Sequence, residues 1–469
     1  MSIRPVLAVA ALCALATPAL AAPQSQDIDA LRAEFDQKVK ALQADYEARL
    51  KALESRVQAA EAQAGQAQST AQTAAATAEQ TAQAAPPPAP PSSAFNPDIS
   101  LILQGAYIDR AGGSRPISGF MPADGAYESV ERGFTLDDSE LVMSANVDPY
   151  LRGYLDLVFN NDQVDVEEAW FQTLQLGHGL TVKGGRFVSG IGYQNEKHPH
   201  AWDFADNNLV YEALFGEHLL QDGVQVRWLA PTELFLELGA EAAKGQHFPG
   251  SDAGGDKNGI GSWAAFGHLG GDIGDSHSWR AGLSYVRARP REREGWVEDL
   301  AGVEALTRFS GTSKTWLADA VWKWAPHGNP RERNLTVAAE YFQRKEDGSL
   351  GCVDNSAEGG ACLGLTDGYG SDQSGWYAQA VYQFMPRWRI GTRYSRLSSG
   401  STDFGLNAVS LDGASRHPQR WALMTDFSPS EFSRFRLQFN RDEALRGDPD
   451  NQFILQYILS LGPHGAHQF

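Results

Sequence analysis

Residues 376–384 read WYAQAVYQF, and this stretch decides the fold. Its even-numbered positions hold W, A, A, Y and F, whereas its odd-numbered positions hold Y, Q, V and Q. A period of two predicts a β-strand with one apolar face. Residues 388–394 (WRIGTRY) and 434–440 (RFRLQFN) repeat the pattern. Their apolar faces begin or end in aromatic residues, as lipid-facing strands do at the two membrane interfaces, so we expect transmembrane strands.

Sixteen segments of this kind occur after residue 97, and the connections between them alternate in length. Tight turns such as 148–149 and 177–179 follow even-numbered segments, and mostly long loops follow odd-numbered ones. This sorting is typical of a bacterial outer-membrane barrel. The sequence therefore predicts an all-β fold, a 16-stranded antiparallel transmembrane β-barrel over 98–469. The expected strands are 98–108, 132–147, 150–160, 164–175, 179–188, 222–230, 233–242, 263–272, 277–288, 314–325, 334–345, 375–385, 388–397, 418–428, 432–442 and 451–462.

Three further segments precede the predicted barrel. Residues 1–22 combine Arg4, a short apolar run and an Ala-x-Ala site, which predicts a cleaved signal peptide. Residues 23–62 carry apolar residues at steps of three and four, which predicts an α-helical coiled coil and hence a homo-oligomer. A lone helix lying on its own domain is the alternative. Residues 63–97 form an Ala/Gln/Pro-rich linker. We expect the barrel in the outer membrane of a Gram-negative bacterium and the coiled coil in the periplasm.

The net charge restricts the kinds of molecule that the protein is expected to bind. The 469 residues include 39 Lys and Arg against 58 Asp and Glu, a net charge of −19, which argues against binding to nucleic acid. An apolar exterior implies contact with outer-membrane lipid. The acidic outer loops are a solvated face that can also bind the divalent ions that bridge lipopolysaccharide.

The polar faces of the clearer strands predict the wall of the pore. They carry nine basic residues against four acidic ones, namely Asp156, Asp319, Glu340 and Asp426. A basic wall concentrates small anions in the lumen, whereas the other interpretation is a set of Arg–Asp ladders that stiffens the barrel. Gly184 and Gly185 are a candidate bulge, so only one of Lys183 and Arg186 need face inward. With Arg186 added to the nine, the predicted basic pore-lining residues are Arg152, Arg186, Arg227, Arg280, Lys323, Arg389, Arg393, Arg420, Arg434 and Arg436.

The longest loop, 189–221, is rich in aromatic and charged residues, which is unusual for a segment surrounded by water. As the third outer connection, it is predicted to fold into the lumen and form the constriction. A subunit latch or an outer lid is the alternative. The constriction residues are expected to be Tyr193, Glu196, Lys197, His198, His200, Trp202, Asp203 and Asp206.

The sequence contains one cysteine pair that could form a disulfide and two histidine pairs that could bind a metal. Cys352 and Cys362 are close enough in one loop to form a disulfide in an oxidising compartment. His198 with His200, and His464 with His467, are two-ligand pairs without a third ligand, so the sequence predicts neither a metal nor a cofactor. No nucleophile elbow or suitably spaced carboxylate pair stands out, so we do not expect an enzyme.

The run Gly185 to Tyr193 (GRFVSGIGY) leads into the long third loop, and the chain ends in Phe469. Together with the coiled coil and the sixteen strands, these features resemble the phosphate-selective porin O and P family over roughly 27–469. The resemblance implies a trimeric outer-membrane channel whose constriction and arginine ladder pass phosphate-like anions. Arg186 matches the Gly-Arg-Phe element of that family.

The predicted function is an outer-membrane porin that passes small anionic, phosphate-like solutes by passive diffusion. Two alternatives remain open. One is an uptake protein for a metal or another scarce nutrient, which the histidine pairs favour. The other is a structural barrel that the coiled coil tethers to the peptidoglycan cell wall. Conductance separates the tether from a porin, because a blocked lumen carries no ion current.

Overall fold

The computed structural model describes residues 97–462 apart from 112–116, 122–131, 137–138, 161–162, 356–357, 446 and 448, together with Gln37, Lys40 and Lys51. The chain divides into two units, Met1–Ala94 and Phe95–Phe469. The three described residues of the first unit are helical and exposed. The predicted signal peptide, the rest of the coiled coil and nearly all of the linker lie outside the described residues, as do His464, His467 and Phe469. No helix among the described residues has the length and hydropathy needed to cross a membrane.

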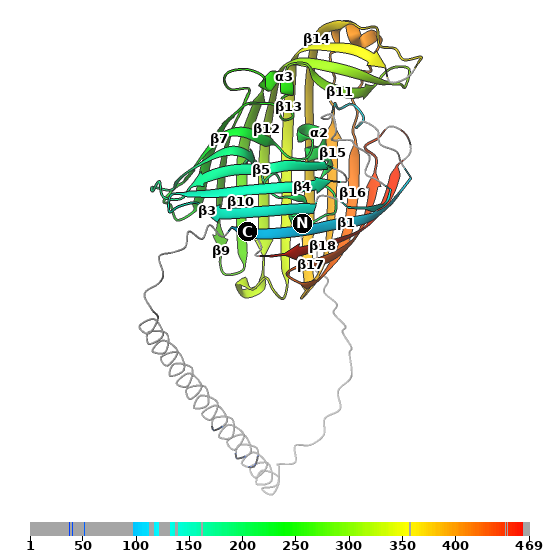
Figure 1. Ribbon diagram of the computed structural model, residues 1–469. Helices are drawn as coiled ribbons and strands as arrows, with labels where there is room; N and C mark the ends of the chain where they lie inside the picture. Colours follow the sequence, from blue (N-terminus) through cyan, green and yellow to red (C-terminus); the bar gives the residue numbers. More distant parts are fainter. Residues whose placement is uncertain are drawn as a thin grey trace, which may run out of the picture. The chain divides into compact units, whose positions relative to one another are not determined.

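The second unit contains one antiparallel sheet of eighteen strands. Two of them, β2 (Gly133–Thr135) and β11 (Arg293–Glu298), are short additions to neighbouring strands. The other sixteen form a cylinder that closes where β1 pairs with β18 from Leu101↔Leu461 to Arg110↔Gln452 (Figure 1). This confirms the predicted closed 16-stranded antiparallel barrel. The remaining strands are β1 (Asp98–Arg110), β3 (Ser139–Asn146), β4 (Leu151–Asn160), β5 (Gln163–Thr173), β6 (Leu180–Val188), β7 (Leu220–Leu229), β8 (Phe235–Ala243), β9 (Ser262–Ile273), β10 (His277–Ala288), β12 (Glu304–Trp324), β13 (Asn334–Asn355), β14 (Thr366–Met385), β15 (Trp388–Ser398), β16 (Gln419–Ser430), β17 (Ser433–Asp442) and β18 (Asp450–Leu461).

Strand β18 shows how the sequence pattern becomes the wall of the barrel. Buried and exposed residues alternate without interruption from Asp450 to Leu461. Gln452 and Gln456 are 5% and 2% exposed, whereas Phe453 and Leu455 are 53% and 54% exposed. Polar groups therefore line the inside and apolar groups cover the outside, the reverse of a water-soluble barrel.

Three strands are longer than the sequence pattern predicted. The sequence pattern places the regions 289–313 and 346–374 in long outer loops, but β12, β13 and β14 continue into them. The short strand β11 pairs with β12 in this extension. Figure 1 shows β11 and the start of β14 at one end of the barrel. This extension has its own apolar cluster, which includes Phe309, Leu350, Tyr369 and Phe404. Packing of that cluster stabilises strands that lack a regular apolar exterior.

Smaller differences occur at other connections. The predicted strand 132–147 is divided into β2 and β3. The disulfide, by contrast, is as predicted: Cys352, near the end of β13, is bonded to Cys362. In the described parts of the connections between strands, the short helices are η1 (Pro199–Ala201), α2 (Leu209–Phe215), α3 (Asp252–Gly255), η2 (Pro326–Gly328) and η3 (Gly405–Val409).

Candidate functional site

The connection between β6 and β7, residues 189–219, lies inside the barrel. Gly190 donates its backbone N–H to Glu241 of β8, and Ala205 donates its own to Gln438 of β17. His198 contacts Glu168 of β5. Strands β5, β8 and β17 are distributed around the closed sheet, so only a segment within the cylinder can reach all of them.

Helix α2 anchors the middle of this connection. Asn208 caps its first turn by accepting hydrogen bonds from the N–H groups of Val210 and Tyr211, and Gly216 ends it in the left-handed conformation at φ 80°. The helix has only seven residues and is marginal in isolation. Burial stabilises it, because its apolar side chains join a cluster with Phe342 of β13 and Tyr377 of β14.

Acidic residues of the connection pair with arginines of β15 and β16. Arg389 Nη1 lies 2.9 Å from Asp203 Oδ1, and Arg393 Nη2 lies 2.6 Å from Asp206 Oδ1. Burial alone would raise the pKa values of Asp203 and Asp206, but the neighbouring arginines lower both below the usual value. Both acids are therefore ionised at neutral pH, and each holds the connection against the wall.

Arg420 is the centre of a second group of ion pairs. Its guanidinium lies 2.7 Å from Glu212 Oε1, 2.8 Å from Asp442 Oδ2 and 3.2 Å from Asp206 Oδ2. The side chain is only 9% exposed. Charge-assisted hydrogen bonds of a forked guanidinium are directional, so this residue fixes both α2 and the segment before it.

Two further arginines of β17 bond mainly to neutral oxygens. Arg434 and Arg436 donate to the carbonyl oxygen of Trp202 at 3.3 and 2.7 Å, and Arg436 also donates to the Gln456 side chain. Arg436 Nε lies 3.9 Å from Asp426 Oδ2. Positive charge at this place is thus less fully compensated than at Arg420.

The other predicted pore-lining residues are spread over four strands. Arg227 of β7 pairs with Glu196 of the connection, and Arg280 of β10 pairs with Asp319 at 3.3 Å. Arg152 of β4 donates to Ser144 Oγ at 3.1 Å, on the same face of the strand as the buried Asp156. Lys323 of β12 shares the inner face of the buried Asp319, two pairs along the same strand.

Two loop residues predicted for the constriction contact each other. Lys197 Nζ lies 3.6 Å above the centre of the Tyr193 ring, and Trp202 donates its indole N–H to the Lys197 carbonyl at 2.6 Å. Burial lowers the pKa of Lys197 from its usual value, although Asp203 and Glu340 oppose this effect. The ring and the cation form a cation–π pair inside the lumen.

Arg186 lies on the outside of the barrel and, contrary to the prediction, does not line the pore. It pairs with Asp222 at 2.8 Å and shares the face of Val224, which is 48% exposed on the outside of the barrel. Lys183 instead points inward, 4.5 Å from the centre of the Trp170 ring. Gly185 between them adopts φ +128°, where its missing Cβ avoids the backbone of β5. The pairings of β6 with β5 and β7 contain no register shift, so the bulge expected at Gly184 and Gly185 is not formed, and Lys183 and Arg186, three residues apart, lie on opposite faces.

A cluster of histidines and carboxylates occupies the wall formed by β3, β4 and β5. His198 Nδ1 lies 3.2 Å from Glu167 Oε2, and its Nε2 lies 3.1 Å from Glu168 Oε1. Two consecutive glutamates reach the same side because β5 has one extra residue opposite β4, between Asp156↔Glu168 and Leu157↔Val166. The further members of the cluster are Glu140, Asp156, His200 and His218.

The ionisation of two histidines in this cluster differs. Burial disfavours the charged form of His198, but Glu167 and Glu168 outweigh this effect and raise its pKa well above the usual value. Burial lowers the pKa of His218 to about 4, with Glu167 only partly opposing the shift. Sequence reasoning missed Glu140, Glu167, Glu168 and His218, because only the fold brings them beside His198.

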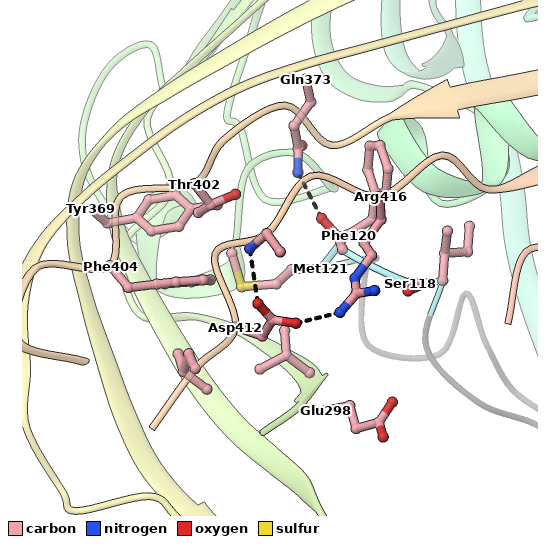
Figure 2. Close-up of a pocket in the computed structure, with 15 residues that line it drawn as sticks. Ser118, Phe120, Met121, Glu298, Tyr369, Gln373, Thr402, Phe404, Asp412 and Arg416 are labelled. Atoms are coloured by element: carbon pink, nitrogen blue, oxygen red, sulfur yellow. Dashed lines mark hydrogen bonds and ion pairs between the residues drawn. The ribbon is translucent and has the colours of Figure 1, made fainter. Parts of the chain in front are cut away.

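A pocket lies among the outer connections, and its lining residues belong to other segments than the connection 189–219. Ile117, Phe120, Met121, Tyr369 and Phe404 supply its apolar lining. Figure 2 shows Arg416 directed at Asp412, with which it forms an ion pair, and Gln373 donating to the Gly119 carbonyl. The Gln373 contact joins the first outer connection to β14, and the Arg416–Asp412 pair lies within the segment before β16.

Several proteins are similar to this chain. Three solved structures align with 78% of it: the outer membrane channel DcaP of Acinetobacter baumannii (14% identity, 97% of that chain, TM-score 0.45), OprB of Pseudomonas putida (14%, 94%, 0.47) and an anion-selective porin from Comamonas acidovorans (10%, 99%, 0.46). No family model matches the sequence.

A relative from Aquifex aeolicus (strain VF5) is much more similar in sequence. It is described as an uncharacterized protein and is 32% identical over 399 residues, which cover 80% of each chain. Identity at this level over most of both chains implies common descent. The chain therefore belongs to the same protein family as this Aquifex aeolicus protein.

Proposed function

We propose that the protein is an outer-membrane porin of a Gram-negative bacterium that passes small anionic, phosphate-like solutes by passive diffusion. One observation carries this proposal: a closed 16-stranded cylinder has an apolar outside and a charged inside, with residues 189–219 held against its inner wall. A closed barrel satisfies every strand hydrogen bond within the membrane, which an open sheet does not. A partly filled, polar lumen suits selective diffusion of small solutes.

Exposed side chains support the membrane location. Trp316, Trp421, Leu423 and Phe435 are 48–53% exposed, and they belong to strands whose alternate residues are buried polar groups. Contiguous apolar surface of this kind is unfavourable in water and matches a hydrocarbon environment. Outer-membrane lipid and lipopolysaccharide are thus the expected surroundings.

The preference for anions is supported by the arginines of β15 to β17. The loop acids compensate part of their charge, but Arg434 and Arg436 bond to neutral oxygens of Trp202 and Gln456. Guanidinium groups offer a planar fork of donors that fits phosphate and carboxylate. Arg436 is only 1% exposed, so an incoming anion reaches it by displacing the Trp202 carbonyl rather than a full carboxylate pair.

The assembly follows from the sequence in front of the barrel. The apolar seam from Ile28 to Ala60 requires partner helices, and we propose a homotrimer whose coiled coil lies in the periplasm and contacts peptidoglycan. We expect the barrel to bind no nucleic acid, because the chain carries a net charge of −19.

The proposal is tested by the current through the purified protein in planar bilayers. We expect discrete conductance steps and, under a potassium chloride gradient, a reversal potential with the sign of anion preference. Added phosphate is expected to lower the chloride current, because it competes for the same guanidinium groups. Cation preference would reject the anionic substrate class. Absence of current would favour the structural tether.

A further inference from the structure

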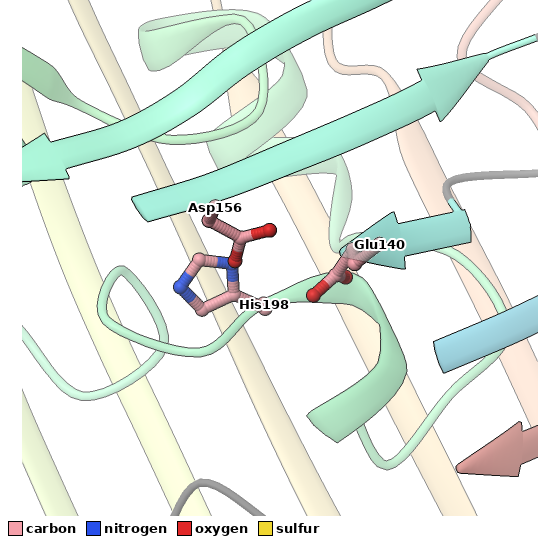
Figure 3. A group of neighbouring side chains, drawn as sticks. All are labelled: Glu140, Asp156 and His198. Atoms are coloured by element: carbon pink, nitrogen blue, oxygen red, sulfur yellow. The ribbon is translucent and has the colours of Figure 1, made fainter. Parts of the chain in front are cut away.

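The cluster around His198 has the composition of a metal centre. Glu140 of β3, Asp156 of β4 and His198 each offer one ligand atom, and these three atoms all lie within 4.8 Å of one another. Figure 3 shows the three side chains converging on one space from two strands and from the loop inside the barrel. Glu167 is a fourth candidate, because its Oε2 lies 3.2 Å from His198 Nδ1.

These side chains are buried and incompletely bonded. The side chains of Glu140 and Asp156 are 0% exposed, and that of His218 is 5% exposed. Within the described part of the chain, Glu140 Oε2, Asp156 Oδ1 and both ring nitrogens of His218 make no hydrogen bond. Buried carboxylate and imidazole atoms normally have hydrogen-bond partners, so these four unpaired atoms mark a place where a ligand can bind.

The charge of the cluster identifies that ligand as a cation. Four carboxylates, those of Glu140, Asp156, Glu167 and Glu168, surround His198. A dication can take the place of the proton on His198 and bind several of these carboxylates at once, so its charge fits this donor set. The ring nitrogens of His218 make no hydrogen bond, and imidazole nitrogens are suitable ligand atoms for the same kind of ion.

The donor atoms distinguish between classes of cation. Ca²⁺ and Mg²⁺ prefer sites made only of oxygen atoms. An imidazole nitrogen beside carboxylate oxygens suits Zn²⁺ and similar first-row divalent ions. In a tetrahedral zinc site neighbouring ligand atoms are about 3.4 Å apart, given metal–ligand bonds of about 2.1 Å. The His198–Glu167 and His198–Asp156 separations of 3.2 and 3.6 Å agree with this spacing.

We propose that Glu140, Asp156 and His198, with Glu167 and His218 beside them, bind one divalent first-row transition metal ion of the Zn²⁺ type. The ion joins the connection 189–219 to β3 and β4, on a different stretch of the wall from the arginines of β15 to β17. It thereby fixes the position of the constriction. This inference is independent of the ion preference of the pore.

Zinc titration of the full-length protein tests the site. The purified protein in detergent is treated with a chelator, dialysed and titrated with Zn²⁺ in a calorimeter, and its thermal unfolding is followed in parallel. We expect one Zn²⁺ per protomer and an increase in Tm on binding. His198→Gln and Asp156→Asn are each expected to weaken binding by at least about tenfold, because each removes a ligand.

Two controls make the result specific. His417→Gln removes an exposed histidine before β16 and is expected to leave zinc binding unchanged. Circular dichroism establishes that each variant retains its β-sheet, and Glu140→Gln replaces any variant that fails to fold. Equal zinc binding by wild type and His198→Gln, or no zinc binding by the wild type, would overturn the site. Equally tight binding of Ca²⁺ would overturn the proposed class of metal.

Discussion

Replacing Arg389 and Arg393 together with glutamate is expected to convert the channel from anion preference to cation preference. Each substitution changes the charge of the inner wall by two units, and both residues directly contact acids of the constriction. A low-dielectric wall concentrates the field in the lumen, so the anion-to-cation permeability ratio should fall by about tenfold or more. Reversal potentials under a salt gradient measure this ratio.

Neutral variants separate the effect of wall charge on the permeability ratio from the effect of displacing the loop. Arg389→Gln with Arg393→Gln also breaks the contacts to Asp203 and Asp206, but it changes the charge by half as much. We expect an intermediate permeability ratio. Asp203→Asn with Asp206→Asn removes negative charge instead and should increase anion preference. If the glutamine and glutamate pairs behaved alike, displacement of the loop rather than the charge of the wall would account for selectivity.

Arg420→Ala is expected to cost the barrel about 3–5 kcal/mol of unfolding free energy, the usual result of removing one partner from a buried ion pair. The substitution leaves Asp206, Glu212 and Asp442 without their shared cation. Denaturant-induced unfolding, followed by intrinsic tryptophan fluorescence in detergent or lipid, measures the change. Because Asp206 and Glu212 belong to the connection inside the barrel, we also expect the open-channel current to become noisier.

Arg441→Ala is the matched control. Arg441 pairs with Glu443 at 2.8 Å, but its side chain is 52% exposed. Exposed pairs contribute about 0–1 kcal/mol, so this variant should unfold close to the wild type. Equal effects of the two substitutions would contradict the assignment of Arg420 as an anchor of the connection.

The sequence predicted the strands most reliably where a membrane would impose a pattern. β15, β17 and β18 alternate apolar and polar residues, and their observed bounds agree with the predicted ones to within two residues. The outer parts of β12, β13 and β14 were missed. Segments such as 346–352 (EDGSLGC) have no regular apolar face, because the apolar cluster that includes Phe309 and Leu350 stabilises them instead of lipid.

The site was harder to predict than the barrel. The faces of Arg389, Arg393 and Arg420 follow from period two alone. The outward face of Arg186 follows from the same period, because β6 pairs with both neighbours without the bulge expected at Gly184 and Gly185. The histidine–carboxylate cluster depends on the bulge at Glu167, which places adjacent glutamates on one side. A local bulge and a loop that meets distant strands leave no periodic signal in the sequence.

A nitroxide scan along β18 tests the central claim most directly. Single cysteines at positions 452 to 459 are spin-labelled in lipid bilayers, and the accessibility of each label to oxygen and to a polar nickel complex is measured. We predict a period of two, with oxygen accessibility highest at Phe453, Leu455, Tyr457 and Leu459, the residues that are 38–54% exposed. Oxygen maxima at Gln452 and Gln456, or no alternation at all, would contradict a barrel with an apolar exterior and a polar interior.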